Sequence, residues 1–261
     1  MIASLGMYDR AETAAANDAL WDLIRDGLRA HGVPAPDALT RGAQAYWPAW
    51  EDPDLLLSQT CGLPFRAQLQ DRVALIGTPE YGVKGCAPGY YRSVLIARAD
   101  DPRSDDPCST EAAFSTAQLA VNDALSQSGW AAVWQHFQQL GLAVPAVLLT
   151  GGHRASALAV AQGQADFAAI DAVKWELLTR HDPCARGLRV FARTIPTPGL
   201  PLITAQPTLV DTLFAAVEAA IGGLSDAHRH TLCLRGLVRI PASAYVSLPI
   251  PPAPAQMSGS L

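Results

Sequence analysis

The sequence predicts an α/β protein of two lobes, each with a mostly parallel sheet flanked by helices. Short apolar segments typical of strands alternate with segments of helical periodicity along most of the chain, which is the pattern of α/β domains. The 261 residues are enough for one large domain or two small ones, and we expect two lobes. Charged residues make up only 16% of the chain, against about 25% in an average soluble domain, which favours extensive burial.

The N-terminal part predicts strand, helix and strand in turn. Residues 2–8 are apolar, and Asp9 with Glu12 indicates a capped helix start. The apolar face of that helix repeats at helical spacing through Leu20, Trp21, Ile24 and Leu28. Residues 55–57 predict a second strand, which leads into a short helix with Pro64 in its first turn. Two further strands are predicted at residues 73–77 and 93–97.

The middle of the chain continues this alternation. Residues 100–109 are polar and contain prolines, which predicts a surface loop and a candidate lobe boundary. An amphipathic helix follows, with its apolar residues at helical spacing: Trp130, Val133, Trp134, Phe137 and Leu140. Further strands are predicted at residues 144–149, 166–170 and 188–192, and helices at residues 153–162 and 172–179.

The C-terminal part contains one clear helix. The segment TIPTPGLPLITA, residues 194–205, has three prolines, which favour an extended crossing over a position inside a sheet. The helix after it carries an apolar face of Leu209, Leu213, Val217, Ile221 and Leu224. Residues 248–261 are rich in proline and are expected to be extended against the surface or disordered.

Charge and hydropathy exclude several partners. The net charge is −5 and no cluster of basic residues exceeds a pair, so we expect no nucleic-acid partner. No apolar run approaches the ~18 residues of a membrane helix, so we expect no membrane insertion. Asp9 and Arg10 follow the opening residues too soon for a signal peptide. The sequence as written therefore predicts a cytoplasmic protein, or a periplasmic one if the true start lies upstream.

Metal and cofactor motifs are missing from the sequence. The five cysteines are scattered without a Cys-x-x-Cys pair, which predicts reduced thiols or small core residues: Cys61, Cys86, Cys108, Cys184 and Cys233. His228 and His230 have no third ligand near them in the sequence, so we expect no metal site. Neither a phosphate loop nor a dinucleotide fingerprint is present, and we expect no cofactor.

Three short polar segments precede predicted helices and can bind an anion. They are Ser58-Gln59-Thr60, Ser126-Gln127-Ser128 and Gly151-Gly152-His153. Backbone N–H groups and the positive end of the helix dipole converge at such a point, and hydroxyl groups add donors. Any one of them alone is more often an ordinary helix cap. The three together favour a shared oxyanion site.

Several further residues are candidates for the same site. Asp171 ends a predicted strand, where open α/β sheets place groups that contact ligands, or it caps the following helix. Tyr8, Tyr90 and Tyr91 either line a cleft or pack with the hydroxyl at its rim. Cys61 stands at a helix start, where a thiol is activated, although a small buried cysteine is the commoner case.

Four segments in order resemble a known family. They are APGYYRSVLIARADDP (87–102), SQSGW (126–130), GGHRASALAVAQGQADFAAID (151–171) and TIPTPGLPLIT (194–204). Together they are similar to the phosphate, phosphite and phosphonate substrate-binding proteins of ABC transporters, from the first strand to about residue 230. The segment that begins at His153 is the most specific of the four.

The resemblance implies the type 2 periplasmic-binding-protein fold, with two α/β lobes, two crossing segments and the ligand between the lobes. Lobe one would comprise residues 1–95 and 200–261, and lobe two residues 96–199. The crossings would lie near residues 94–99 and 193–202.

The resemblance also implies which residues bind the ligand. The oxyanion would be held in lobe two by Ser126, Gln127, Ser128 and His153, with Asp171 near the rest of the ligand. Lobe one would contribute Ser58, Gln59, Thr60 and Tyr8, and Tyr91 is a further candidate. Gln127 replaces the middle hydroxyl of the usual Ser-Thr-Ser-Gly turn, which leaves the identity of the ligand open.

The function implied is binding of a small phosphate-, phosphite- or phosphonate-like oxyanion, without catalysis. The protein would be the substrate-binding component of an ABC transporter, with the permease as its partner if it is exported, or an intracellular relative. The alternative is an enzyme on the same fold that acts on a small metabolite, with Cys61 or His153 as the catalytic group.

Overall fold

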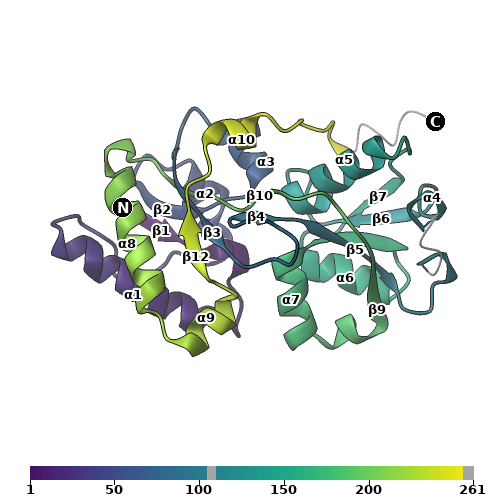
Figure 1. The fold of residues 1–261 in the computed structure, drawn as a ribbon, viewed down its shortest axis with the longest axis horizontal. Coiled ribbons are helices and arrows are strands. Elements are labelled where there is room, and N and C mark those ends of the chain that lie inside the picture. The colour runs from purple at the N-terminus through teal and green to yellow at the C-terminus, as the bar shows by residue number, and fades with distance from the viewer. Residues whose placement is uncertain (105–109, 255–261) are drawn as a thin grey trace. The chain divides into compact units, whose positions relative to one another are not determined.

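The computed structural model describes residues 1–104 and 110–254, so Cys108 and the last seven residues of the expected tail, 255–261, lie outside the described part. The chain forms two compact units (Figure 1). Unit 1 comprises Met1–Tyr90 and Pro198–Leu248, and unit 2 comprises Tyr91–Thr197 and Pro249–Leu261. The expected lobes, 1–95 with 200–261 and 96–199, differ from these units at both crossings and in the tail. Whether the units act as lobes that close on a ligand stays a prediction.

A five-stranded sheet forms the centre of unit 1, in the order β1-β2-β11-β3-β12. Its strands are β1 (Ile2–Ser4), β2 (Leu55–Gln59), β11 (Leu202–Thr204), β3 (Ala74–Glu80) and β12 (Gly236–Val238). β1 runs parallel to β2, whereas β11 runs antiparallel to both β2 and β3, and β12 runs antiparallel to β3. The expectation that residues 194–205 avoid the interior of a sheet is therefore wrong for its end. The three prolines precede β11, so each of its residues keeps its N–H donor.

Two layers of helices enclose the unit 1 sheet. On one face, α1 (Ala14–Ala30), α8 (Val210–Gly223) and α9 (Asp226–Leu232) pack together around Trp21, Ile24 and Leu213. On the other face lie the shorter elements α2 (Trp47–Trp50), η3 (Phe65–Leu69) and α10 (Ala242–Val246), packed around Trp50, Phe65 and Tyr245. The connections contain short helical turns: η1 (Gly6–Tyr8), η2 (Gly42–Ala45), α3 (Gly62–Pro64) and η7 (Pro207–Leu209).

The predicted cap of the first helix is wrong. α1 begins at Ala14, and Asp9 lies outside it, where the Asp9 carboxylate accepts hydrogen bonds from Asn17 and Arg41. Thr13 is instead the residue that precedes α1. Its hydroxyl accepts a hydrogen bond from the Arg10 N–H at 3.0 Å and donates one to the Tyr8 carbonyl at 2.8 Å. These bonds hold the turn between Arg10 and Thr13 against Tyr8.

Unit 2 contains a second five-stranded sheet, in the order β7-β6-β8-β5-β9. Its strands are β5 (Ser93–Arg98), β6 (Gln118–Val121), β7 (Ala146–Leu149), β8 (Phe167–Asp171) and β9 (Leu188–Arg193). β6 pairs in parallel with β7 and β8, while β5 runs antiparallel to β8 and β9. The α/β class is confirmed, but the strand pairings are mixed. The strand that follows a crossing, β11 in unit 1 and β5 in unit 2, runs antiparallel to both of its neighbours.

The helices of unit 2 alternate with its strands. They are α4 (Thr110–Ala113), η5 (Gln127–Ala131), α5 (Ala132–Gln139), α6 (His153–Ala161) and α7 (Ala172–His181), with the turns η4 (Pro102–Ser104) and η6 (Pro183–Gly187). At the crossings, the short strands β4 (Tyr90–Tyr91) and β10 (Thr197–Pro198) form a two-stranded ribbon.

No single helix within residues 1–104 and 110–254 is both long and apolar enough to span a membrane. Only Pro207–Gly223 and Asp226–Leu232 taken together meet the length and composition, and they are bent by 115°.

Candidate functional site

Polar groups gather at one edge of the unit 2 sheet. β7, β6 and β8 are parallel, so their carboxyl ends share an edge. Thr150 follows β7, Asn122 follows β6 and Asp171 ends β8. Ser93 begins the antiparallel strand β5 and pairs with Asp171, which places it at the same edge. Because η5, α6 and α7 begin here, three helix N-termini with their N–H groups adjoin these side chains.

The turn before η5 is fixed by its own serine. The Ser126 side chain accepts a hydrogen bond from the Gly129 N–H at 2.9 Å, which makes Ser126 the N-cap. The Ser93 hydroxyl donates to the Ser128 carbonyl at 2.7 Å and holds the turn from the strand side. Ser126, Gln127 and Ser128 are all at most 5% exposed, so the turn forms a rigid part of the sheet edge.

Gly129 allows this turn to lie close to the loop after β6. A Cβ atom at Gly129 would lie 1.7 Å from Asn122 Oδ1, far inside van der Waals contact. The Asn122 Oδ1 atom is itself buried and has no hydrogen-bond partner. A glycine is therefore required for the backbone of η5 to approach Asn122.

Ser128 and His153 bring two helix starts together. The Ser128 hydroxyl lies 3.0 Å from His153 Nε2. The His153 residue as a whole is half-buried, but its Nδ1 atom is buried, and the ring also interacts with the backbone of Ala169. Burial lowers the pKa of His153 to about 3, and the positive charge of Lys174 acts in the same direction. The ring is therefore neutral at neutral pH, with one nitrogen able to donate and the other able to accept.

The loop before His153 is anchored by hydroxyl groups. The Thr150 N–H donates to the Val121 carbonyl at 2.9 Å, and the Thr150 and Ser156 hydroxyls lie 2.7 Å apart. Gly151 has a φ of 84°, in the left-handed region that favours glycine. These contacts place His153 as the first residue of α6.

Asp171 caps the next helix. Its carboxylate accepts hydrogen bonds from the Val173 N–H at 2.7 Å and the Lys174 N–H at 3.1 Å, and the residue is 2% exposed. Of the two interpretations of Asp171, these hydrogen bonds support capping of α7. A contact to ligand stays a prediction.

In unit 1, the Ser58 hydroxyl forms hydrogen bonds with other side chains of the same unit. It is fully buried, and its hydroxyl lies 2.6 Å from the Ser4 hydroxyl and accepts from the Trp50 indole N–H at 3.1 Å. Successive side chains of a strand point to opposite faces, so Ser58 and Gln59 on β2 face different surroundings. We therefore leave Ser58 out of the proposed ligand contacts.

Gln59 supports a tyrosine. Its Nε2 atom donates to the Tyr81 hydroxyl at 2.9 Å and to the Leu200 carbonyl at 3.2 Å. These two bonds use both amide hydrogens, so Gln59 is suited to holding Tyr81 rather than to donating to an oxyanion. Thr60 is fully buried, and its hydroxyl has no partner, which keeps it a candidate donor.

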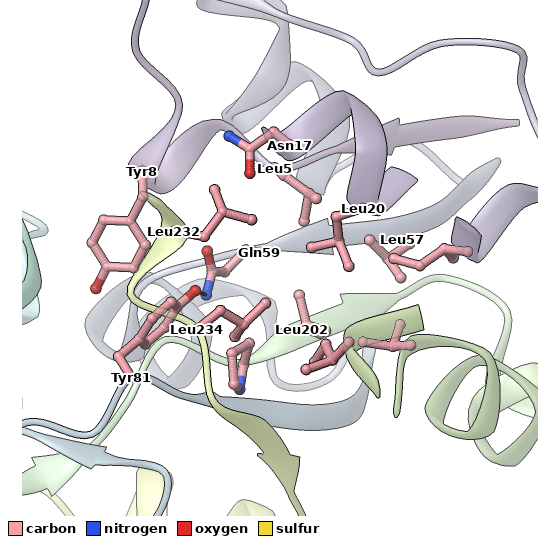
Figure 2. Close-up of a pocket in the computed structure, with 14 residues that line it drawn as sticks. Leu5, Tyr8, Asn17, Leu20, Leu57, Gln59, Tyr81, Leu202, Leu232 and Leu234 are labelled. Atoms are coloured by element: carbon pink, nitrogen blue, oxygen red, sulfur yellow. Dashed lines mark hydrogen bonds between the residues drawn. The ribbon is translucent and has the colours of Figure 1, made fainter. Parts of the chain in front are cut away.

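Tyr8 lies beside Tyr81 at a pocket of unit 1. The two rings meet edge to face, with their centroids 5.0 Å apart. The pocket has about 480 Å³ of empty space, part of it open to solvent, and Figure 2 shows Tyr8, Gln59 and Tyr81 together at one side of it. The aromatic candidate near the first strand thus borders a pocket that is partly open to solvent.

The remaining candidates are Tyr90, Tyr91 and Cys61. Tyr91 belongs to β4 at a crossing and is 3% exposed, and Tyr90 is half-buried. Cys61 precedes α3, is 6% exposed and makes no capping bond with its side chain. Within the described residues, no group of three or more His, Cys, Asp or Glu side chains is placed to hold a metal ion.

Five polar residues near these candidates were not predicted from the sequence. In unit 2 they are Ser93, Asn122, Thr150 and Ser156, and in unit 1 Tyr81. Asn122 and Thr150 each follow a strand at the carboxyl edge, so their position after a strand was the available indication. Ser93 was harder to find because it contributes from the start of an antiparallel strand.

Known proteins show the fold and the family. No curated protein matches the sequence. Among solved structures, PhnD1 from Prochlorococcus marinus, determined with methylphosphonate, has a TM-score of 0.69 at 15% identity over 94% of this chain and 95% of its own. The binding component of an ABC phosphonate transporter from Pseudomonas aeruginosa has a TM-score of 0.67 at 17% identity, over 98% and 85%. A chloride-bound protein from Xanthomonas citri has a TM-score of 0.66 at 15% identity, over 98% and 96%.

At 15% to 17% sequence identity, these solved structures show only that the chain shares their fold. The family follows from the sequence model described as "ABC transporter, phosphonate, periplasmic substrate-binding protein", which matches residues 57–243. That range includes the turn at Ser126, the helix at His153 and the cap at Asp171. The chain therefore belongs to the periplasmic substrate-binding proteins of phosphonate ABC transporters.

Proposed function

We propose that the protein binds a small phosphonate or a related oxyanion at the carboxyl edge of the unit 2 sheet. The observation that carries this proposal is the pairing of Ser128 with His153 at the starts of two helices. Backbone N–H groups of the first helical turns are directed outward there and favour negative charge. Ser126, Gln127, Ser128 and His153 form the proposed oxyanion site.

The neutral state of His153 fits an anion site of this kind. When Nε2 carries the ring proton, the ring donates to the Ser128 oxygen and leaves the Ser128 hydroxyl hydrogen for an oxyanion. The Nδ1 atom is buried, so it does not reach a ligand. In this proposal Ser128 donates to the oxyanion and His153 holds the Ser128 hydroxyl in place.

Two residues of unit 1 stay proposed ligand contacts. They are Thr60, whose hydroxyl is buried without a partner, and Tyr8, which borders the pocket of that unit. Gln59 positions Tyr81, and Tyr91 stays a proposed contact from the crossing. Asp171 acts first as the cap of α7.

A thermal-shift panel with phosphate, phosphite, methylphosphonate and aminoethylphosphonate tests the proposal. At least one of these ions is expected to raise the melting temperature in proportion to the logarithm of its concentration, because it binds only the folded state. If none does, the proposed function is wrong.

A matched pair of serine caps separates binding from stability. Ser126 accepts from the Gly129 N–H, and Ser225 accepts from the His228 N–H in the same way at the start of α9. Ser126→Ala and Ser225→Ala are each expected to cost about 1 kcal/mol of folding stability. Only Ser126→Ala is expected to weaken the ligand response, and an equal response in both variants would contradict the site.

The biological role follows from the family. Its members are substrate-binding components of transporters, so we propose binding without catalysis, with the permease of an ABC transporter as the partner. The family is described as periplasmic, and the cytoplasmic location predicted from the opening residues stays a prediction that cell fractionation tests. The enzyme alternative, with Cys61 or His153 as the catalytic group, stays a prediction that the reactivity of Cys61 toward iodoacetamide tests.

A further inference from the structure

Ser93 connects three parts of unit 2 at the candidate site. It is the first residue of β5 and is 1% exposed. Its hydroxyl donates to the Ser128 carbonyl at 2.7 Å, its N–H donates to the Thr194 hydroxyl at 3.0 Å, and its carbonyl accepts from the Thr194 N–H at 3.0 Å. In the sheet, Ser93 also pairs with Asp171, the cap of α7. One buried residue therefore links the turn before η5, the end of β8 and the residue after β9.

The Ser93 hydroxyl fixes one peptide group of the candidate site. The peptide between Ser128 and Gly129 accepts from Ser93 through its carbonyl and donates from its N–H to the Ser126 side chain at 2.9 Å. Because a peptide group is planar, bonds at both of its ends fix its rotation, and with it the direction in which Ser128 presents its hydroxyl. Ser128 is only 3% exposed. Without the Ser93 hydroxyl its carbonyl would lose this donor, and the turn would gain by rotating toward another.

Thr194 holds Ser93 from the opposite side. It is 2% exposed, and its hydroxyl accepts from the Ser93 N–H and donates to the Ile195 carbonyl at 3.3 Å. Both residues lie close to a crossing, since Ser93 follows shortly after Tyr91, where unit 2 begins, and Thr194 stands shortly before Thr197, where that stretch of unit 2 ends. The two crossing segments are therefore hydrogen-bonded to each other at the residue that holds the Ser128 turn.

We propose that Ser93 and Thr194 are positioning residues of the oxyanion site, which set the direction of the Ser128 hydroxyl and link the site to both crossing segments. The inference rests on the proposed function, which supplies the ligand. Neither residue contacts the ligand, because both hydroxyls are engaged within the protein, and each acts through the peptide between Ser128 and Gly129. An ion bound at Ser128 then stabilises the bonds between Ser93 and Thr194 as well.

Calorimetric titration of methylphosphonate into the full chain and its variants tests the proposal. Ser93→Ala removes the bond to the Ser128 carbonyl and is expected to weaken binding about tenfold, the effect of one hydrogen bond. Thr194→Val removes the support of Ser93 and is expected to weaken binding about threefold. Thr194→Ser retains the hydroxyl and is expected to bind like the wild type. Circular dichroism checks folding, and the two Thr194 variants decide the matter if Ser93→Ala does not fold.

Thr204→Val in unit 1 is the matched control. The Thr204 hydroxyl is also buried, accepts from the Gln206 N–H at 3.0 Å and donates to the Leu55 carbonyl at 3.2 Å. This variant is expected to lower the melting temperature by about as much as Thr194→Val but to leave the affinity unchanged. Wild-type affinity in both Ser93→Ala and Thr194→Val, or an equal loss in Thr204→Val, overturns the inference.

Hydrogen exchange measured by mass spectrometry tests the link to the crossings. Saturating methylphosphonate is expected to slow exchange in the wild-type peptide that covers Thr194, and this protection should be lost in Ser93→Ala. Without any added ion, Ser93→Ala is expected to exchange faster at residues 126–130, whereas Thr204→Val is not. Unchanged exchange at both places overturns the inference while the proposed function stands. If the wild type binds neither methylphosphonate nor phosphate, the proposed function is wrong and the inference falls with it.

Discussion

The Ser128 hydroxyl lies 3.0 Å from His153 Nε2, and this contact joins the first turn of η5 to the first residue of α6. The two residues are 25 positions apart and follow different strands, β6 and β7, whose parallel pairing brings the helix starts together. The contact is thus a direct product of the sheet topology.

Acid is expected to destabilise the protein partly through His153. The pKa of His153 in the folded state is lowered to about 3, below the ordinary value of about 6.5. Between these values the unfolded chain binds the proton and the folded chain does not, so stability is present above pH ~6.5 and falls as the pH drops toward 3. His153→Gln should reduce the loss of unfolding free energy between pH 6 and pH 4 by ~2 kcal/mol. Urea denaturation at each pH measures it, and identical pH profiles would contradict the burial of the ring.

Gly129→Ala is expected to disrupt the turn before η5. The added Cβ would lie 1.7 Å from Asn122 Oδ1, so the loop after β6 or the helix start must move. We expect both a lower melting temperature and a loss of the ligand response. Gly222→Ala in α8 is the control, because nothing lies within 4 Å of its Cβ position, and alanine there should stabilise the helix by up to about 1 kcal/mol. Equal effects of the two changes would show that Gly129 has no special role.

Asp171 is expected to act through its capping bonds. Asp171→Asn retains an oxygen acceptor for the N–H groups of Val173 and Lys174, whereas Asp171→Ala removes it. We therefore expect Ala to cost about 1 kcal/mol of unfolding free energy, and Asn much less. Ligand affinity should survive in Asp171→Asn or increase, since a negative charge near the site is lost. A large loss of affinity in this variant would instead identify Asp171 as a direct ligand contact.

Trp130 is expected to hold the end of the described chain. Its indole N–H donates to the Pro252 carbonyl at 2.9 Å, and the ring is fully buried. Trp130→Phe keeps most of the packing but removes the donor, at a cost of about 1 kcal/mol. Hydrogen exchange measured by mass spectrometry should then increase in the peptide that covers Ala253, while peptides of unit 1 stay unchanged. Equal exchange in both proteins would show that the bond does not hold the tail.

Cys61 is expected to be unreactive in the native protein. It is 6% exposed, whereas Cys86 and Cys233 are half-buried. Iodoacetamide should therefore modify Cys86 and Cys233 first, with Cys61 labelled only on unfolding. Peptide mass spectrometry measures the order of labelling. Rapid and selective labelling of Cys61 would revive the interpretation of this residue as a nucleophile.

Much of the fold could be predicted from the sequence because periodicity is local. The amphipathic pattern from Trp130 to Phe137 corresponds to η5 and α5, and residues 153–162 correspond to α6 (His153–Ala161). β6 was missed, since Gln118–Val121 has only four residues and its burial comes from the neighbouring strands β7 and β8. Strand direction was also beyond local reasoning, because the antiparallel positions of β5 and β11 depend on how the chain crosses between units.

Part of the candidate site could also be predicted from the sequence, and part could not. The sequence indicated that Ser126 and His153 stand at helix starts, since caps leave local patterns. It gave no means of seeing that Ser58 is enclosed by Ser4 and Trp50 while Gln59 faces Tyr81, because those partners come from distant segments. The pairing of Ser128 with His153 and the pocket that Tyr8 and Tyr81 border likewise exist only once the sheets have formed.

Calorimetric titration of methylphosphonate into the wild type and into Ser128→Ala tests the central claim most directly. The account predicts saturable binding to the wild type and a loss of affinity of about 10- to 100-fold in the variant, since a hydrogen bond to a charged group is worth about 1.5–3 kcal/mol. Circular dichroism should show that the variant is folded. Affinity that is unchanged in Ser128→Ala, or the absence of binding to the wild type, would contradict the account.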